Sequence, residues 1–228
     1  MSSRLYQTVL FDLDGTLLDT APDLADALNA TLLANGRAAL AFDDIRPAVS
    51  HGGAALIRVG FRLDEAHPRF EALRQQLLSH YLEHIADRTR LFAGMEEVLS
   101  GLEARGLAWG VVTNKPAWLT HPLLEALALD RRAASVVCGD TLAQRKPHPA
   151  PLLHACKATG SRPEQCLYVG DAERDVRAGL DAGMATLVAM FGYLREDDRP
   201  ESWGADALID APGDILDWLD VAGRSARR

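Results

Sequence analysis

Two aspartates, Asp12 and Asp14, stand two residues apart directly after the first apolar run of the chain. Residues at this spacing point to the same side of an extended backbone, so both carboxylates face one site. Gly15 follows them and permits the close backbone approach that a phosphate-holding loop needs. Such a pair can supply a nucleophile and a general acid–base. The alternative is an ordinary polar turn at the end of a strand.

A second aspartate pair, Asp171 and Asp175, follows the apolar run 166–169. Asp171 is expected at a strand tip and Asp175 one helical turn further on. Together with Asp12 they bring several carboxylates to one edge of a sheet. Carboxylate oxygens suit Mg²⁺, which takes one or two of them together with water and phosphate. The alternative is a helix-capping aspartate and a solvated helix face.

Two further polar residues follow apolar runs. Thr113 ends the run 107–113, and its hydroxyl can donate to a phosphoryl oxygen. Lys146 precedes Pro147 in a loop where Pro can open the next helix. A threonine that merely ends a strand and a surface lysine are the ordinary alternatives. In chain order, however, every one of these residues lies at or beyond an apolar run.

The elements that must position these residues alternate along the chain. Short apolar runs predict strands at 6–11, 107–113, 135–138, 166–169 and 185–189. Helical patterns separate them at 118–129, 151–159, 173–182 and 212–219. Near-continuous apolar strands alternating with helices are typical of a parallel sheet covered on both faces. The prediction is an α/β fold, a doubly wound Rossmann-like parallel sheet.

One stretch, from about residue 19 to 87, interrupts this alternation. Leu24, Leu28 and Leu32 recur at helical spacing, and the segment 70–85 shows a similar pattern. We therefore expect an inserted all-helical cap domain at 19–88 and a catalytic core formed by 1–18 and 89–228.

The four motifs together resemble those of the haloacid dehalogenase superfamily: Asp12-Leu-Asp14-Gly-Thr, Thr113, Lys146, and Gly170-Asp171 with Asp175. The resemblance covers nearly the whole chain, including the helical cap after the first motif. It implies a phosphatase or phosphomutase, because the dehalogenases do not keep Asp14 in its acid–base role.

The resemblance also implies roles for the residues. Asp12 would be the nucleophile that forms an aspartyl-phosphate, and Asp14 would protonate the leaving alkoxide. Thr113 and Lys146 would hold the phosphoryl oxygens. The metal ligands for Mg²⁺ would be Asp12, the backbone carbonyl of Asp14, and Asp171, with Asp175 orienting that shell.

Residues 110–116 resemble the phosphoglycolate phosphatase group of this superfamily. Residues 51–53, 91–95, 110–116 and 203–206 together resemble the bacterial N-acetylmuramic acid 6-phosphate phosphatases of peptidoglycan recycling more closely. The leading substrate is thus N-acetylmuramic acid 6-phosphate, with 2-phosphoglycolate as the runner-up. A β-phosphoglucomutase-like mutase and a non-enzymatic, receiver-like phospho-acceptor are the alternatives.

The cap is expected to select the substrate. Ser50, His51, Gly52 and Gly53 form a polar, Gly-rich break that resembles the cap loop reaching the active site in phosphoglycolate phosphatases. His51 and Arg58 could contact an acidic substrate, as could Asn114 beside Thr113. A surface turn and a solvated helix charge are the alternatives for the cap residues.

The chain has 228 residues and a net charge of −8, from 24 basic and 32 acidic residues. This balance disfavours nucleic acid and anionic lipid as partners but not a small phosphorylated metabolite. No apolar run approaches the roughly 18 to 20 residues that span a bilayer. Three cysteines without CxxC spacing indicate no disulfide framework. We expect a cytoplasmic monomer or small homo-oligomer.

The segment His80-Tyr-Leu-Glu83-His84 matches the HxxEH pattern of some zinc proteases. The same residues also fit the solvated face of an amphipathic helix. Because no third ligand is identifiable, we expect the helix face rather than a zinc site.

Overall fold

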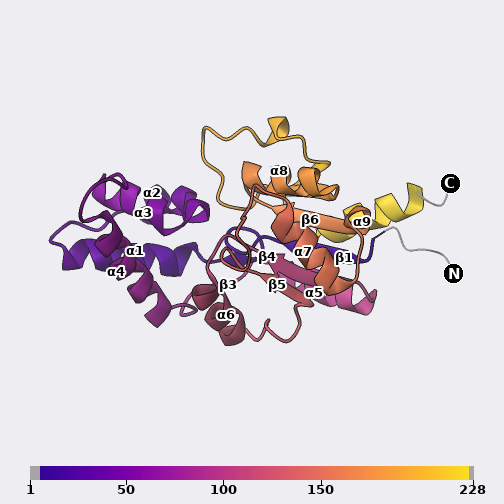
Figure 1. Ribbon diagram of the computed structural model, residues 1–228, viewed down its shortest axis with the longest axis horizontal. Coiled ribbons are helices and arrows are strands. Elements are labelled where there is room, and N and C mark those ends of the chain that lie inside the picture. Colours follow the sequence, from indigo (N-terminus) through magenta and orange to yellow (C-terminus); the bar gives the residue numbers. More distant parts are fainter. Residues whose placement is uncertain (1–5, 226–228) are drawn as a thin grey trace.

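The computed structural model describes residues 6–225, and a parallel sheet lies at its centre (Figure 1). Among these residues the sheet has six strands, in the order β5-β4-β1-β6-β7-β8. Their bounds are β1 Thr8–Phe11, β4 Ala108–Val112, β5 Ser135–Val137, β6 Cys166–Gly170, β7 Ala185–Ala189 and β8 Ala207–Ile209. The order reverses beside β1, as in doubly wound folds. The predicted fold class is confirmed.

Alternate residues of the central strands enter different cores, which explains why the strands are apolar throughout. Val9 and Phe11 of β1 pack with α5 (Met95–Ala104), α6 (Ala117–Ala126) and α9 (Asp214–Ser225). Leu10 lies in the other core, with α7 (Ala150–Thr159) and α8 (Glu173–Ala182). Helices therefore cover both faces of the sheet, and only the strand ends remain open to a ligand.

The predicted strands agree with β1, β4, β5, β6 and β7 to within a few residues at each end. Several elements were not predicted, among them one helix and one strand of the core. Helix α5 lies between the insert and β4, and β8 is a three-residue strand at the edge of the sheet. Short one-turn 3₁₀ segments, η2 (Pro163–Gln165) and η3 (Pro200–Ser202), lie in the connections.

The helical insert, residues 21–83, forms a separate layer at one end of the sheet (Figure 1). It consists of α1 (Ala21–Ala34), α2 (Phe42–Ile45), η1 (Arg46–His51), α3 (Gly52–Phe61) and α4 (Phe70–Glu83). Its apolar side chains form a cluster of their own, which Leu119 and Tyr193 of the core join. The predicted boundaries at 18/19 and 88/89 stay a prediction.

The chain passes between the core and the helical insert twice, and two short antiparallel strands join these two connecting segments. The strands are β2 (Leu18–Asp19) and β3 (Arg90–Leu91). Beside them the buried Asp23 carboxylate accepts hydrogen bonds from the backbone N–H groups of Arg88 and Thr89 and from the Thr89 hydroxyl. Residue 19, placed in a strand-free stretch by the sequence, is thus in a two-residue strand.

No helix in the described part of the chain is long and apolar enough to cross a bilayer.

Candidate active site

Three neighbouring strands, β4, β1 and β6, end at the same edge of the sheet and present the predicted site residues there. Asp12 follows β1, Thr113 follows β4, and Asp171 follows β6. All three are at most 4% exposed. Their closeness results from the parallel register, in which Phe11 lies opposite both Val111 and Val169.

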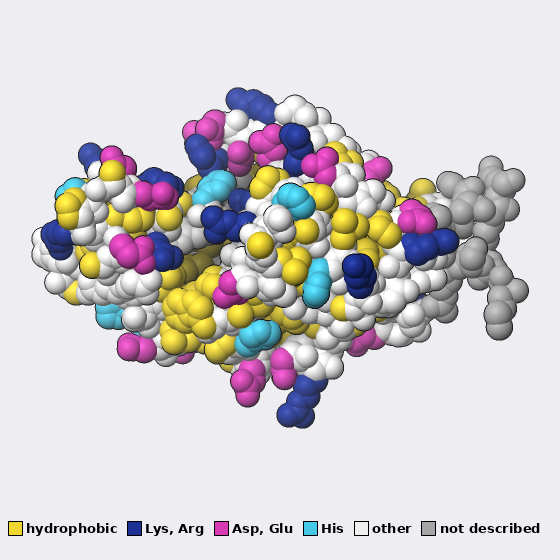
Figure 2. Space-filling model, in the orientation of Figure 1, with side chains coloured by type: hydrophobic (Ala, Val, Ile, Leu, Met, Phe, Trp, Pro, Cys, Tyr) yellow, Lys and Arg dark blue, Asp and Glu magenta, His cyan; other side chains and the backbone are white. Residues whose placement is uncertain are grey.

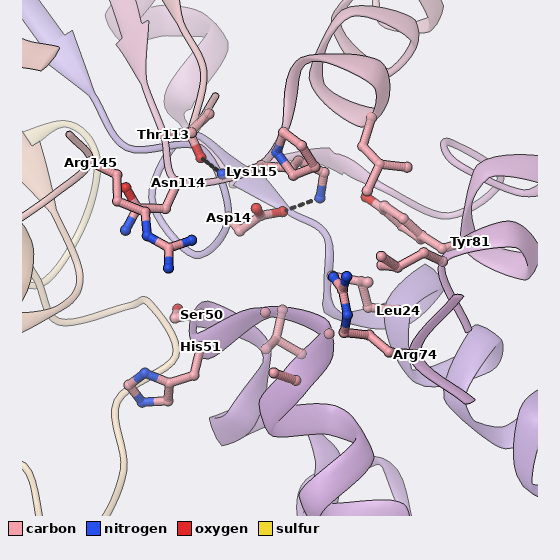
Figure 3. A pocket seen from close by; sticks show the side chains of 18 of the residues that line it. Asp14, Leu24, Ser50, His51, Arg74, Tyr81, Thr113, Asn114, Lys115 and Arg145 are labelled. Atoms are coloured by element: carbon pink, nitrogen blue, oxygen red, sulfur yellow. Dashed lines mark hydrogen bonds and ion pairs between the residues drawn. The ribbon is translucent and has the colours of Figure 1, made fainter. Parts of the chain in front are cut away.

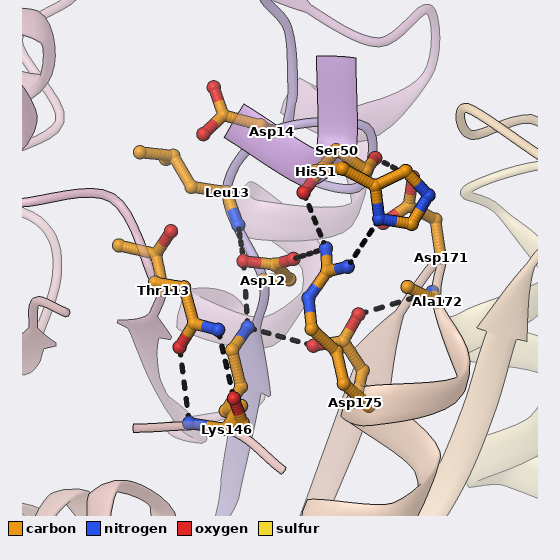
Figure 4. Close-up of polar contacts among 12 residues, drawn as sticks. Asp12, Leu13, Asp14, Ser50, His51, Thr113, Lys146, Asp171, Ala172 and Asp175 are labelled. Carbon is orange, nitrogen blue, oxygen red and sulfur yellow. Dashed lines mark hydrogen bonds and ion pairs between the residues drawn. The ribbon is translucent and has the colours of Figure 1, made fainter. Parts of the chain in front are cut away.

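Lys146 is buried and joins two of the aspartates (Figure 4). Its ammonium Nζ lies 2.9 Å from Asp12 Oδ1 and 2.8 Å from Asp175 Oδ1. It also donates to the carbonyl of Val112 and contacts the Tyr168 hydroxyl, each at 2.8 Å. Lys146 is therefore held by four oxygen atoms and offsets negative charge beside Asp12.

The ligand oxygens of Asp12, Asp171 and Asp175 lie within 4.8 Å of one another. Asp171 Oδ1 is buried and has no hydrogen-bond partner among the described residues. Asp175 is already engaged, because Oδ1 contacts Lys146 and Oδ2 accepts from the Ala172 N–H. These residues fit a divalent cation bound by Asp12 and Asp171, with Asp175 fixing Lys146 and the Ala172 backbone beside them.

The electrostatics agree with a site that attracts a cation. Burial raises the pKa of Asp171 to about 7, and the nearby Asp12 and Asp175 carboxylates add to the shift. Burial also raises the pKa of Asp12, although Lys146 opposes it. Burial acts on Asp175 too, but Lys146 and Arg174 outweigh it and hold its pKa below the ordinary value. The three carboxylates thus outnumber the two cationic side chains beside them, Lys146 and Arg174.

Asp14 lies apart from this triad, and its carboxylate faces the cavity instead (Figure 3). Its Oδ1 atom is 2.9 Å from Lys115 Nζ and accepts a 2.7 Å hydrogen bond from the Thr20 hydroxyl. Burial alone would lower the pKa of Lys115, but the adjoining Asp14 raises it above its ordinary value. Lys115 is thus a cation beside Asp14. The expected metal contact of the Asp14 carbonyl stays a prediction.

The last residues of η1, Ser50 and His51, lie where the helical insert meets the core (Figure 4). The Ser50 hydroxyl donates to Asp171 Oδ2 at 2.7 Å. Arg174 donates to the Ser50 carbonyl at 2.8 Å, contacts His51 Nδ1 at 3.3 Å and lies 4.0 Å from Asp12 Oδ2. Desolvation and Arg174 lower the pKa of His51. Ser50 and His51 therefore close one side of the site.

A cavity of about 570 Å³ lies between the helical insert and the core, with Asp12, Asp14 and Thr113 in its wall. Figure 2 shows the surface hollowed there, with Lys, Arg and His side chains beside the hollow. Five cationic side chains line the cavity: Arg58, Arg74, Lys115, Arg145 and Arg174. Four carboxylates, those of Asp12, Asp14, Glu65 and Asp140, also line it, so the lining has a small excess of cationic side chains although the whole chain is acidic.

The predicted substrate residues all line this cavity, but their contacts differ. His51, Gly52 and Gly53 form its wall at the start of α3. Arg58 pairs with Glu65 at 2.5 Å. Asn114 binds the backbone of Lys146 with both ends of its amide, at 2.9 and 3.1 Å. Asn114 therefore holds Lys146 in place, a role that the sequence did not indicate.

The HxxEH segment forms no metal cluster in the described part of the chain. His84 directly follows α4 and pairs with Asp87 at the surface, while Tyr81 is buried.

Sequence reasoning missed several residues of the site. Lys115 follows Thr113 and Asn114 at the tip of β4, and Arg174 stands between Asp171 and Asp175. Their closeness in sequence to the motif residues could have identified them as site residues. Ser50 belongs to the Gly-rich break 50–53 that the sequence singled out, although its contact with Asp171 was not predicted. Tyr81 had no such signal, because only the packing of the helical insert brings it to the core.

Comparisons with known proteins show the family of the chain. The family model for haloacid dehalogenase-like hydrolases matches residues 9–189. The chain is 41% identical over 222 residues to the N-acetylmuramic acid 6-phosphate phosphatase of Pseudomonas aeruginosa, covering 97% of this chain and 98% of the relative. It is 45% identical over 209 residues to the phosphoglycolate phosphatase of Xanthomonas campestris, covering 92% and 94%.

A crystal structure described as a predicted phosphoglycolate phosphatase from Haemophilus somnus superimposes with a TM-score of 0.83 at 28% identity. It covers 96% of this chain and 99% of that one. The family match, the two relatives and this structure point to the same enzyme class. The chain therefore belongs to the haloacid dehalogenase-like hydrolases, and it is a phosphatase of that family.

Proposed function

We propose that the chain is a Mg²⁺-dependent phosphomonoesterase that forms an aspartyl-phosphate on Asp12 and acts on N-acetylmuramic acid 6-phosphate. One observation carries the proposal: Asp12 and Asp14 line the same cavity, which is also lined by cationic side chains. The two carboxylates have different partners, Lys146 and Lys115, as two different roles require.

The proposed reaction forms the aspartyl-phosphate and then hydrolyses it. An oxygen of Asp12 attacks phosphorus, the ester P–O bond breaks, and its electron pair goes to the leaving oxygen, which takes a proton from Asp14. Asp14 then removes a proton from water, which attacks the phosphorus. The Asp12–phosphorus bond breaks, restoring the carboxylate and releasing inorganic phosphate.

The remaining residues position the phosphate and offset its charge. The Thr113 hydroxyl donates to a phosphoryl oxygen, and Lys146 balances charge at Asp12. Bound Mg²⁺, held by Asp12 and Asp171, would supply positive charge that lets a phosphate dianion approach the carboxylates. Like charges about 4 Å apart otherwise repel by roughly 4 kcal/mol at an effective dielectric near 20.

The size of the cavity favours the larger of the two candidate substrates. N-acetylmuramic acid 6-phosphate is a bulky sugar phosphate with a lactyl carboxylate, and a cavity of about 570 Å³ is in the range for such ligands. The Pseudomonas aeruginosa relative bears this substrate's name. The Xanthomonas campestris relative is named for phosphoglycolate, which makes 2-phosphoglycolate the second candidate.

Phosphate release from both esters separates the candidates. We expect a higher kcat/KM with N-acetylmuramic acid 6-phosphate. A higher value with 2-phosphoglycolate would reverse the ranking, and turnover of neither would reject both. Interconversion of glucose 1- and 6-phosphates without net phosphate release would identify a mutase instead.

We also propose a cytoplasmic location and a monomer or small homo-oligomer. Free thiols at Cys138, Cys156 and Cys166 support a reducing compartment. Cell fractionation tests the location, and light scattering of the purified chain tests the assembly state.

A further inference from the structure

Lys115 lies in the active site, but none of the steps above uses it. Its side chain is 6% exposed, and its backbone is fixed on both sides. Its N–H donates to the Thr113 hydroxyl at 3.1 Å, and its carbonyl accepts from the Gly139 N–H at 2.9 Å. The tip of β4 therefore fixes the backbone of Lys115, and burial restricts its side chain.

The ammonium of Lys115 lies between a carboxylate of the core and an aromatic ring of the helical insert (Figure 3). Asp14 Oδ1 is 2.9 Å away, and the centroid of the Tyr81 ring is 4.5 Å away. A cation at this distance from a ring face is attracted by it. Tyr81 belongs to α4 and is fully buried, so its ring restricts the position of the Lys115 ammonium.

The same Asp14 oxygen accepts from the Thr20 hydroxyl at 2.7 Å. Thr20 directly precedes α1, where the chain enters the helical insert. Two groups therefore fix one oxygen of Asp14 and leave its other oxygen without a hydrogen bond among the described residues. A carboxylate held by one oxygen can present the other to a leaving group.

Resting on the proposed function, we propose that Lys115 is a positioning residue that holds Asp14 for proton transfer, with Tyr81 of the helical insert holding Lys115. Lys115 keeps its own proton throughout and contacts neither the phosphorus nor the nucleophile. Because Tyr81 comes from the insert, the acid–base group is correctly placed only when the insert lies against the core.

The dependence on the leaving group tests this role. An alkyl phosphate needs a proton on its leaving oxygen, whereas 4-nitrophenyl phosphate releases a stable phenolate and does not. Lys115→Met should therefore lower kcat for N-acetylmuramic acid 6-phosphate by about a hundredfold, the lower range for acid–base catalysis. With 4-nitrophenyl phosphate the pre-steady-state burst of nitrophenolate should keep its rate, and only the later turnover should slow.

Lys115→Arg is the matched variant, because it keeps a cation beside Asp14, and it should recover most of the alkyl-ester activity. Lys115→Gln repeats the test if Lys115→Met does not fold, and it should show the same difference between the esters. An equal loss of burst rate and of alkyl-ester kcat would overturn the proposal. Failure of the proposed function is distinguishable, since the wild-type chain would then show no burst and no alkyl-ester turnover.

Discussion

Asp12 and Asp14 have different surroundings although a single residue separates them. The Asp12 side chain is 4% exposed and contacts Lys146, whereas that of Asp14 is 16% exposed and contacts Lys115 and Thr20. A nucleophile must stay ionised beside a phosphate, and an acid–base group must reach the leaving oxygen. The two environments suit these two tasks, which is the general way in which paired carboxylates divide acid–base chemistry.

Arg145 is the residue that we expect to bind the carboxylate of the substrate. It lines the cavity, and among the cavity's cationic side chains it is the one without an ion pair in the described part of the chain. Arg145→Gln should raise KM for N-acetylmuramic acid 6-phosphate about tenfold, the effect of losing one charge-assisted hydrogen bond. KM for glucose 6-phosphate, which has no carboxylate, should change little.

Arg58→Gln is the matched control, because its guanidinium is already paired with Glu65, and it should have the smaller effect. Equal increases in KM for the acidic and the neutral ester in Arg145→Gln would contradict the assignment.

At the scale of the elements, Asp23 of α1 holds the segment at residues 88 and 89, where the chain returns from the helical insert to the core. Its buried carboxylate binds two backbone N–H groups and one hydroxyl at residues 88 and 89. Asp23→Ala would leave these donors unpaired, so the free energy of unfolding should fall by about 3 kcal/mol. Urea unfolding measures it.

Asp26→Ala removes a neighbouring carboxylate whose ion pair with Arg88 is exposed, and it should cost less than about 1 kcal/mol. Similar decreases in the free energy of unfolding in the two variants would show that Asp23 does not stabilise the segment at residues 88 and 89.

The sheet and the longest insert helices could be predicted because their patterns are local. The strands β1, β4 and β6 are apolar on both faces, and α1 repeats leucine at helical spacing. The edge strand β8 was missed because Leu208 is exposed and the strand has three residues. The contacts of Ser50 with Asp171 and of Tyr81 with Lys115 could not be predicted, since they join segments distant in sequence.

At the scale of the whole molecule, the net charge of −8 coexists with a cavity lined by cationic side chains. Four of the 32 acidic residues, Asp12, Asp14, Asp171 and Asp175, lie in the proposed active site. A small phosphate ester is bound locally and needs no broad basic surface, unlike a nucleic acid. The charge count therefore disfavours polyanions and is compatible with the proposed phosphorylated metabolite.

Metal binding should stabilise the whole fold. Mg²⁺ at about one hundred times its Kd should add about 2.7 kcal/mol to the free energy of unfolding and raise Tm. Asp171→Asn should abolish this increase. Without metal, the variant should unfold at a higher temperature than the wild type, because one of three clustered buried carboxylates has lost its charge. An equal Mg²⁺-dependent increase in Tm in both proteins would place the metal elsewhere.

The most direct test of the account is to find the phosphoryl group on the enzyme. The chain is mixed with N-acetylmuramic acid 6-phosphate and Mg²⁺, quenched in acid during turnover, digested and analysed by mass spectrometry. The account predicts one phosphoryl group on the peptide that contains Asp12, assigned to that residue by fragmentation, and none in Asp12→Asn, which should be folded but inactive. A phosphoryl group on another residue, or substantial turnover by Asp12→Asn, would contradict it.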